Sequence, residues 1–368
     1  MNQLTATPPT VATRMNVELP TTMGLDLSDR ISTFHVLRGD GETLNEGKVP
    51  TERARLEALF RRFRGCRLVI EVGTHSPWIS RLGQECGMEV FVANPRCLTE
   101  ISRSNRKTDR ADAKILADTG RISVERLHPI SHRTKQAQVD LSIQRARTGL
   151  VRARTGLINQ VRGVLKSHGY RAKSCSAETF AKHVRCILAP ELEPSLGPLL
   201  QILNVVNAQI LAYEKRLAQL ERTQAVSEHL QEIPGIGTIG AVTFALTVDD
   251  PTRFKKSRQM GAYIGAVPRK QESGESNPEL GITKAGDSEL RRLLVLSSQY
   301  ILGPFGADCD LRRYGQRIIG DGKKKAAKKR AVIAVARKLA VLMHHLWVTG
   351  DKYDPFHLAK KRGEAVPA

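Results

Sequence analysis

The segment Lys107-Thr108-Asp109-Arg110-Ala111-Asp112 holds two acids three residues apart. Residues at positions i and i+3 share one face of a helix, so Asp109 and Asp112 would point the same way. Five basic residues lie between positions 101 and 114 alongside these acids. Two carboxylates facing the same way in a positive field are suited to hold a divalent metal ion against a phosphate. A solvated helix with local ion pairs is the alternative for an isolated pair of this kind.

Short runs typical of strands precede this segment, among them the alternating run 30–38 and the apolar run Arg67-Leu-Val-Ile-Glu-Val72, which indicates a buried strand. The predicted strands are residues 23–28, 30–38, 43–49, 67–72 and 88–93, and the predicted helices are residues 50–63, 77–85 and 108–119. The order β-β-β-α-β-α-β-α is that of an RNase H-like α/β domain, which we assign to residues 23–125. Residues 1–22, rich in Thr, Pro and other small or polar types, are predicted to be a disordered leader.

This topology predicts that four acids converge. Asp26 lies on the first strand and Glu71 on the fourth, which are neighbours in such a sheet, and the helix with Asp109 and Asp112 would pack across them. Four uncompensated carboxylates would repel one another, and one or two divalent ions bound by oxygen ligands would resolve the conflict. Each acid could instead be a turn former, a cap or a surface charge. The apolar strand contexts of Asp26 and Glu71 weigh against that alternative, because an unpaired charge is costly there.

The composition indicates a polyanionic partner. Lys and Arg number 58 against 37 Asp and Glu, and the net charge of +21 is typical of a protein that binds nucleic acid in a salt-dependent manner. Packing of the ribosomal or chromatin type would explain this charge equally well. Aromatic residues make up 5% of the chain, which argues against broad base-stacking platforms.

The cysteines and the apolar runs bear on location. Six cysteines without CxxC spacing argue against a structural zinc site or a disulfide framework. We expect no membrane span, because charged residues and histidines interrupt the longest apolar run, residues 331–348. The amino end has no basic region followed by an apolar core, so no secretion signal is expected and the bacterial cytoplasm is the predicted location.

Residues 130–225 are predicted to form a helical arm. The motif Arg145-Ala-Arg-Thr-Gly-Leu150 recurs as Arg152-Ala-Arg-Thr-Gly-Leu157. Apolar residues recur at intervals of seven, at Ile143, Leu150, Leu157 and Val164. Such heptads favour a coiled coil, with residues 194–223 as an antiparallel partner helix.

Glycines in this arm suggest a close contact, because glycine costs about 1 kcal/mol relative to alanine inside a helix. They stand one residue before three of the heptad positions, at Gly149, Gly156 and Gly163. We therefore expect a dimerising arm, and a helix packed only within its own chain is the alternative. Its basic face is predicted to contact nucleic acid through Arg145, Arg147, Arg152 and Arg154.

Residues 226–350 are predicted to be a mainly α-helical carboxyl-terminal domain, followed by a tail at residues 351–368. The segment Ile233-Pro-Gly-Ile-Gly237 between two helical stretches matches a helix-hairpin-helix turn. The N–H groups at Gly235 and Gly237 would hold a phosphate without reading sequence. A simple Gly-Pro helix break is the alternative.

A second polar segment surrounds Ser273-Gly274. Basic residues predicted to contact nucleic acid flank it, at Lys270, Lys284, Arg291 and Arg292. A serine hydroxyl is a poor nucleophile until a base or a metal ion activates it, and residues 251–300 contain no histidine. The residues alone therefore favour a loop serine over a nucleophile.

Two further basic clusters are predicted to contact phosphates. One flanks the paired acids and consists of Arg106, Lys107 and Arg110. The other opens a helix and consists of Lys323, Lys324, Lys325, Lys328, Lys329 and Arg330. A solvated charge run is the alternative for the second cluster.

Taken together and in order, these motifs resemble the DEDD-type transposases of insertion sequences, the family of bridge-RNA-guided recombinases. The amino-terminal likeness rests on Gly24-Leu-Asp26-Leu-Ser28, Ile70-Glu71 and Lys107–Ala113. The carboxyl-terminal likeness rests on Ile233–Gly237, on Pro268 with Ser273-Gly274, and on Gly281-Ile-Thr-Lys-Ala-Gly286. One departure is Asp29, where relatives commonly carry a lysine.

The resemblance implies roles for the motif residues. Asp26, Glu71, Asp109 and Asp112 would bind one or two Mg²⁺ ions in a RuvC-like domain. Ser273 would be the nucleophile that joins covalently to DNA, brought from one protomer to the acids of another. The arm would make a homodimer, and four protomers would hold donor and target DNA. A non-coding bridge RNA would pair with both DNAs.

The leading hypothesis is therefore a transposase or recombinase that cleaves and exchanges DNA strands with metal assistance through a serine-linked intermediate. A junction-resolving nuclease that uses the same acids with water as nucleophile is a second hypothesis. A non-catalytic scaffold that binds RNA and DNA is a third.

Overall fold

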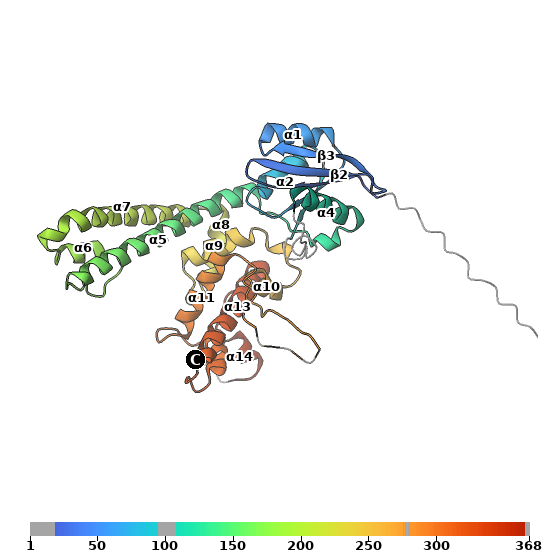
Figure 1. The fold of residues 1–368 in the computed structure, drawn as a ribbon. Coiled ribbons are helices and arrows are strands. Elements are labelled where there is room, and N and C mark those ends of the chain that lie inside the picture. Colours follow the sequence, from blue (N-terminus) through green and yellow to red (C-terminus); the bar gives the residue numbers. More distant parts are fainter. Residues whose placement is uncertain (1–18, 95–107, 275, 277, 279, 365–368) are drawn as a thin grey trace, which may run out of the picture. The chain divides into compact units, whose positions relative to one another are not determined.

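The computed structural model describes residues 19–94, 108–274, 276, 278 and 280–364 (Figure 1). The chain divides into two compact units, Met1–His132 and Arg133–Ala368, called here the amino-terminal and the carboxyl-terminal unit. Most of the predicted leader, the end of the predicted tail, and the predicted phosphate contacts Arg106 and Lys107 lie outside the described residues.

The amino-terminal unit is built on a mixed sheet of five strands in the order β3-β2-β1-β4-β5. Its elements are β1 (Thr22–Asp26), β2 (Ile31–Leu37), β3 (Thr43–Pro50), α1 (Arg53–Arg62), β4 (Arg67–Glu71), α2 (Ser76–Glu85), β5 (Glu89–Ala93) and α4 (Asp109–Ile122). β1, β2 and β3 pair antiparallel, whereas β1, β4 and β5 pair parallel. The predicted α/β class and the order of its elements are confirmed for this unit.

Successive strand residues point to opposite faces of this sheet, and the two faces have different partners. On one face, Met23 and Leu25 of β1 are fully buried in a cluster with Leu56 of α1 and Ile79 of α2. The other face is covered by α4, which lies against β1, β2 and β4. The unit is therefore a sheet between two helical layers.

The carboxyl-terminal unit is helical. Its helices are α5 (Lys135–Ser167), α6 (Phe180–Arg185), α7 (Glu193–Ala218), α8 (Glu221–Leu230), α9 (Thr238–Val248), α10 (Met260–Tyr263), α11 (Ser288–Leu302), α12 (Asp310–Ile319), α13 (Lys325–Thr349) and α14 (His357–Lys361). Short 3-10 turns lie at Glu125–Leu127 in the first unit and at Pro190–Leu192, Pro251–Arg253 and Ser257–Gln259 in the second. The predicted helical character of the arm and of the carboxyl-terminal part is confirmed.

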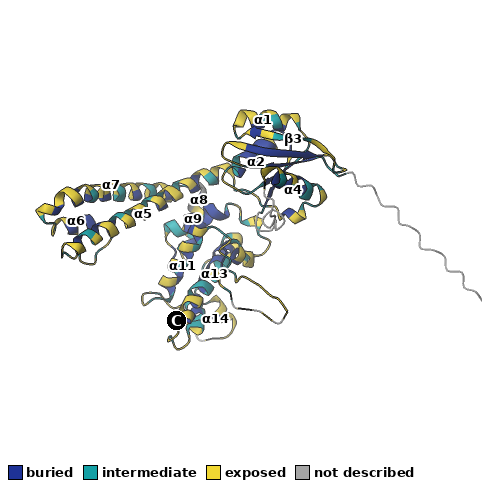
Figure 2. Ribbon diagram, in the orientation of Figure 1, coloured by how far each residue is buried: buried dark blue, intermediate teal, exposed yellow. Residues whose placement is uncertain are grey.

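The arm consists of α5 and α7 side by side (Figure 1). Arg147 of α5 pairs with Glu214 of α7, and Arg154 donates to Asn207, so the two helices run antiparallel. Much of the outer surface of this pair is exposed (Figure 2).

The buried side of α5 differs from the predicted heptad row. The fully or nearly fully buried residues include Leu141, Thr148, Ile158, Val161 and Leu165. The predicted row at Ile143, Leu150, Leu157 and Val164 is only half-buried. The predicted heptad residues therefore lie beside the most buried side of α5 and do not form it.

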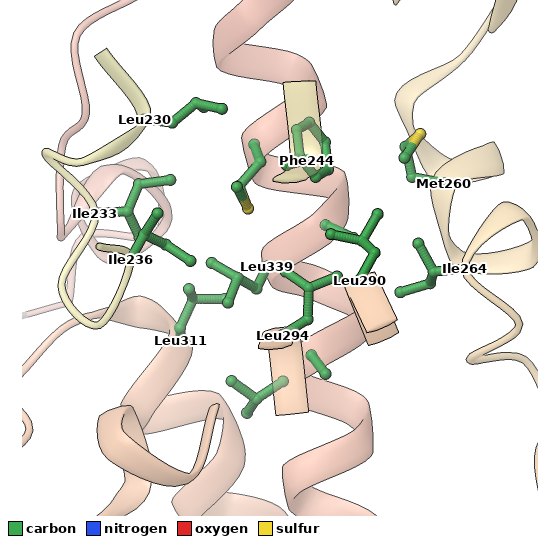
Figure 3. Close-up of a cluster of buried hydrophobic side chains, with 14 of the residues drawn as sticks. Leu230, Ile233, Ile236, Phe244, Met260, Ile264, Leu290, Leu294, Leu311 and Leu339 are labelled. Carbon is green, nitrogen blue, oxygen red and sulfur yellow. The ribbon is translucent and has the colours of Figure 1, made fainter. Parts of the chain in front are cut away.

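The rest of the unit packs around α13, whose Val335, Leu339 and Met343 are fully buried. Figure 3 shows Leu290 and Leu294 of α11 beside Leu339, with Phe244 and Met260 in the same cluster. These contacts join α9, α10, α11 and α12 into one core.

Two helical stretches in the described chain, Pro190–Ala218 and Lys325–Thr349, are long and apolar enough to cross a membrane by length and composition. Length and composition alone do not contradict the expectation of no membrane span. These criteria are weak evidence for a membrane span, because the buried core helix of a water-soluble protein also meets them. α13 is a buried helix of the described chain, since its Leu339 lies among the other labelled side chains of the cluster in Figure 3.

Candidate active site

Asp26 and Glu71 end two neighbouring strands. In the parallel pairing of β1 with β4, the last registered pair is Leu25 with Ile70, so the next residues along the two strands are Asp26 and Glu71. Both are half-buried. The topology thus brings together, at one edge of the sheet, two acids that are far apart in the sequence.

The same two acids lie on the sheet face that α4 covers. Gly24, two residues before Asp26, is in contact with α4, since a Cβ atom built there would stand 2.0 Å from the carbonyl oxygen of Ala113. Val69, two residues before Glu71, faces α4 as well, because a Cβ on Gly120 would meet its Cγ2 at 2.3 Å. Residues two apart on a strand share a face, so Asp26 and Glu71 point toward α4.

The direction of α4 brings its first turn to this edge. Arg67, at the start of β4, donates to the carbonyl of Gly120 near the end of α4 at 2.6 Å, so the helix runs opposite to the strand. Thr108 caps the helix by accepting from the Ala111 N–H at 3.2 Å. Asp109 is exposed and Asp112 is 7% exposed in this first turn. All four predicted acids therefore belong to elements that end or begin at one edge.

The donor set is that of a hard cation, because Mg²⁺ prefers carboxylate oxygens. Among the residues that the structure describes, however, no three His, Cys, Asp or Glu side chains are close enough together to hold a metal ion. The elements that carry the four acids meet at one edge of the sheet, but in the described chain their side chains do not form a set of metal ligands. The residues fit the chemistry of Mg²⁺, and the carboxylates would have to turn toward one another to bind it.

An ion pair holds the first turn of α4 against the sheet. Gly24, His35 and Glu46 form one row across β1, β2 and β3, because each is the registered partner of the next. Arg110 donates through Nε to the Glu46 carboxylate at 2.9 Å, and its Nη2 donates to the other oxygen. Arg110 therefore fixes the helix that carries Asp109 and Asp112, in addition to the phosphate contact predicted for it.

Asp29 has a partner at the same edge. The Trp78 indole N–H donates to Nδ1 of His75 at 3.2 Å, and His75 Nε2 lies 3.0 Å from an Asp29 carboxylate oxygen. Because an indole N–H can only donate, Nδ1 is the acceptor and Nε2 carries the proton that Asp29 accepts. This contact joins the loop after β1 to the residue that precedes α2.

Ser273 lies in an exposed hairpin of the carboxyl-terminal unit. Pro268 and Ile282 form a bridge near its base, and Ser273 and Ser276 exchange two backbone hydrogen bonds of 3.1 and 3.0 Å. Gly274 follows with φ +55°, a left-handed conformation that suits glycine. Ser273 is exposed in this hairpin.

The base of this hairpin is closely packed. A Cβ on Gly286 would stand 1.9 Å from the carbonyl oxygen of Tyr263, and one on Gly265 would stand 2.4 Å from the Ala285 nitrogen. Arg291 donates to the carbonyl oxygen of Ile264 at 2.8 Å. The structure thus gives Arg291, predicted to contact nucleic acid, a role in holding the hairpin.

Several other predicted nucleic-acid contacts are engaged within the chain. Arg147 and Arg154 are 14% and 13% exposed, with partners on α7 and at Glu178. Arg292 forms a bidentate pair with Glu289, and the hydrogen bond raises its pKa. Arg110 and Arg292 are exposed although each has a carboxylate partner, and the other exposed predicted contacts are Arg145, Arg152, Lys270, Lys284, Lys323, Lys324, Lys325, Lys328, Lys329 and Arg330.

The Ile233–Gly237 turn joins α8 to α9 beside a groove of about 830 Å³. Gly235 has φ +84°, and a Cβ there would stand 3.0 Å from the Tyr300 ring, which gives this glycine a packing reason of its own. Within the described chain no side chain caps the start of α9, and Gly237 and Thr238 line the groove with Tyr300. Uncapped N–H groups at a helix start are suited to bind a phosphate.

Sequence reasoning missed the row of residues beside the acids. His35 and Glu46 lie at alternating positions of β2 and β3 and looked like ordinary strand residues. The strand register, which depends on the tertiary fold, pairs His35 with Gly24 on one side and with Glu46 on the other. The only signal in the sequence was the even spacing of Thr33 and His35 along one strand.

Comparison with known proteins identifies the family. The family model described as "Transposase", for the DEDD domain of IS110-type elements, matches residues 23–169. The model described as "Transposase IS116/IS110/IS902 family" matches residues 227–303. Together the two matches cover more than half of the chain, and each contains one of the two predicted motif regions.

Similar proteins agree with this result. The "Transposase for insertion sequence element IS1111A" of Coxiella burnetii is 27% identical over 296 residues, covering 78% of this chain and 79% of its own length. The "Transposase for insertion sequence element IS1328" of Yersinia enterocolitica is 29% identical over 281 residues, covering 75% of this chain and 82% of its own. The chain therefore belongs to the IS110-type family of insertion-sequence transposases and is a DNA transposase.

Proposed function

We propose that this transposase cleaves and exchanges DNA strands with Mg²⁺ bound by Asp26, Glu71, Asp109 and Asp112. The observation that supports this most directly is the continuation of the β1–β4 register to Asp26 and Glu71, under the first turn of α4. Mg²⁺ would stabilise the charge that develops on the phosphate oxygens during transfer. The protein's part is to hold four carboxylates at one sheet edge, between basic residues that attract the DNA backbone.

Ser273 is the proposed nucleophile. Its Oγ would bond to phosphorus, the bond from phosphorus to the leaving sugar oxygen would break, and the hydroxyl proton would pass to water while the leaving oxygen gains one. Strand exchange then reverses this step with the hydroxyl of the other DNA. Its exposed place in a projecting hairpin supports delivery to the acids of another protomer.

The arm is the proposed dimer contact. A Cβ on Gly149, Gly156 or Gly163 would meet nothing within 4 Å in the described chain, so contacts within one protomer do not require glycine there. Exposed small residues along α5 would let a second arm approach closely. A pair of such dimers would hold donor and target DNA, and a non-coding bridge RNA would pair with both.

Backbone binding would be shared among exposed basic residues. The two residues before α13 and the first turns of α13 present six Lys and Arg side chains between residues 323 and 330, all exposed. The groove beside Gly237 and Thr238 offers N–H groups for a further phosphate. Both kinds of contact position a nucleic acid without reading its bases, which suits a protein whose guide RNA supplies the sequence.

Trapping the reaction tests this function. Purified protein is incubated with bridge RNA, labelled donor DNA, target DNA and Mg²⁺, denatured, and the labelled peptide is mapped. The label should fall on Ser273, Ser273→Ala should form neither adduct nor recombinant, and Asp112→Asn should form neither as well. Ser276→Ala is the matched control, because Ser276 pairs with Ser273 across the hairpin and should be dispensable.

Two results would replace this proposal with another. DNA cleavage that survives Ser273→Ala but needs Asp112 would favour the junction-resolving nuclease. Rearrangement that survives Asp112→Asn would reject catalysis by these acids and leave a nucleic-acid-binding scaffold.

A further inference from the structure

Thr33 lies beside Asp26 in the same cross-strand row. The register pairs Asp26 of β1 with Thr33 of β2, and Thr33 with Lys48 of β3. Directly opposed residues on antiparallel strands share a face and have Cβ atoms about 4.5–5.5 Å apart. The Thr33 side chain therefore points to the α4 side of the sheet, next to the first of the four acids.

The hydroxyl of Thr33 is buried without a partner. The residue is 5% exposed, and its Oγ1 has no hydrogen-bond partner among the described residues. A buried hydroxyl normally finds a partner, because leaving one unpaired costs stability. A valine would fill almost the same space without that cost. The described chain thus retains a buried hydroxyl for which it supplies no partner.

We propose that Thr33 is a positioning residue of the acid site, whose hydroxyl donates a hydrogen bond to the Asp26 carboxylate when that carboxylate turns to hold the metal ion. This inference rests on the proposed metal-binding function. Groups that hydrogen-bond to ligating carboxylates fix their orientation, and losing such a group commonly costs about 10–100-fold in metal affinity. Asp26 stands at the end of β1, and a neighbour on β2 is well placed to orient it.

Thr33→Val tests this role because stability and metal binding should change in opposite directions. Melting of the full-length variant is measured in EDTA and across a Mg²⁺ titration. In EDTA the melting temperature should equal or exceed that of the wild type, since an unpaired buried hydroxyl has been removed. The Mg²⁺ concentration for half-maximal stabilisation should rise about tenfold, and Thr33→Ser, which keeps the hydroxyl, should restore it.

Thr243→Val is the matched control. Thr243, on α9 in the other unit, is 1% exposed, and its hydroxyl also has no partner among the described residues. This variant should change the melting temperature in EDTA as Thr33→Val does, but leave the Mg²⁺ titration unchanged. It therefore separates loss of a buried hydroxyl in general from loss of this one.

The outcomes are distinguishable. If Mg²⁺ stabilises the wild type and Thr33→Val to the same degree at the same concentrations, the role of Thr33 is rejected while the metal site stands. If Mg²⁺ does not stabilise the wild type, both the metal site and the role of Thr33 are rejected. If Thr33→Val melts lower in EDTA and Thr33→Ser does not restore the Mg²⁺ titration, Thr33 serves packing alone and the proposal fails.

Discussion

Gly24 of β1 and Ala113 of α4 are in direct backbone contact, since a Cβ on Gly24 would stand 2.0 Å from the Ala113 carbonyl oxygen and 2.5 Å from the Ala117 nitrogen. Neither of these atoms belongs to a side chain that could move aside. The glycine therefore sets how closely the helix with Asp109 and Asp112 approaches the strand that ends in Asp26.

Gly24→Ala should consequently destabilise the amino-terminal unit by about 2–4 kcal/mol, the range of a severe steric change in a core. Urea unfolding measures it. Gly73→Ala is the control, because a Cβ there would meet nothing within 4 Å in the described chain, and its cost should stay within about 0.5 kcal/mol. Equal effects of the two variants would mean that α4 does not pack on β1 as described.

The pair between Glu46 and Arg110 should contribute a measurable coupling. Exposed ion pairs are typically worth about 0.2–1 kcal/mol, and the bidentate geometry here favours the upper part of that range. A double-mutant cycle of Glu46→Gln and Arg110→Gln, read by urea unfolding, should give a coupling near that value. Strictly additive effects of the two substitutions would show that Glu46 does not hold the first turn of α4.

Glu289 should make the carboxyl-terminal unit sensitive to acid. Burial raises the pKa of the Glu289 carboxyl. The opposing effects together outweigh burial: the hydrogen bond and charge of Arg292, the hydrogen bond of Thr148 and the charge of Arg152 all lower the pKa. The net pKa therefore lies below the ordinary value of 4.5. A lowered pKa in the folded state adds stability that is present above the unfolded pKa and is lost as pH falls through the folded pKa.

The free energy of unfolding should therefore decrease as the pH is lowered from 4.5. Glu289→Gln should remove part of this pH dependence. The variant should also lose about 1.5–3 kcal/mol at neutral pH, because Arg292 loses a charged partner. Urea unfolding across pH measures both. An unchanged acid limb in the variant would contradict the assignment.

Gly156 should distinguish stability of the arm from its self-association. Alanine there meets no atom within 4 Å in the described chain and should stabilise α5 by about 1 kcal/mol. Leucine should instead obstruct the proposed dimer contact. In sedimentation velocity, Gly156→Leu should be mainly monomeric and Gly156→Ala should still be dimeric. If both variants are dimeric, the dimer contact does not involve Gly156.

The basic start of α13 should appear in the salt dependence of DNA binding. Each phosphate contact contributes about 0.9 to the slope of log K against log salt. Replacing Lys323, Lys324 and Lys325 with Gln should lower that slope by about 2–3. Arg154→Gln is the control, since Arg154 is engaged with Glu178 and Asn207 and its loss should lower stability but not the slope.

Local patterns predicted the class and order of the amino-terminal elements, because the alternation along β2, the apolar run of β4 and the helical spacing after Thr108 depend only on neighbouring residues. The sequence also identified the family, because each of the ordered motifs between Gly24 and Gly286 consists of a few neighbouring residues. The helical character of residues 135–167 followed from the same kind of local signal.

Which distant residues meet depends on the tertiary fold. Strand register placed Thr33 beside Asp26 and Glu46 beside His35, and no local pattern contains that pairing. The buried side of α5 is not the predicted heptad row, because the residues that become buried depend on how α7 packs against α5. Arginines such as Arg147 and Arg291 look like phosphate contacts in the sequence, and only the folded chain supplies the carboxylate or carbonyl that each one binds.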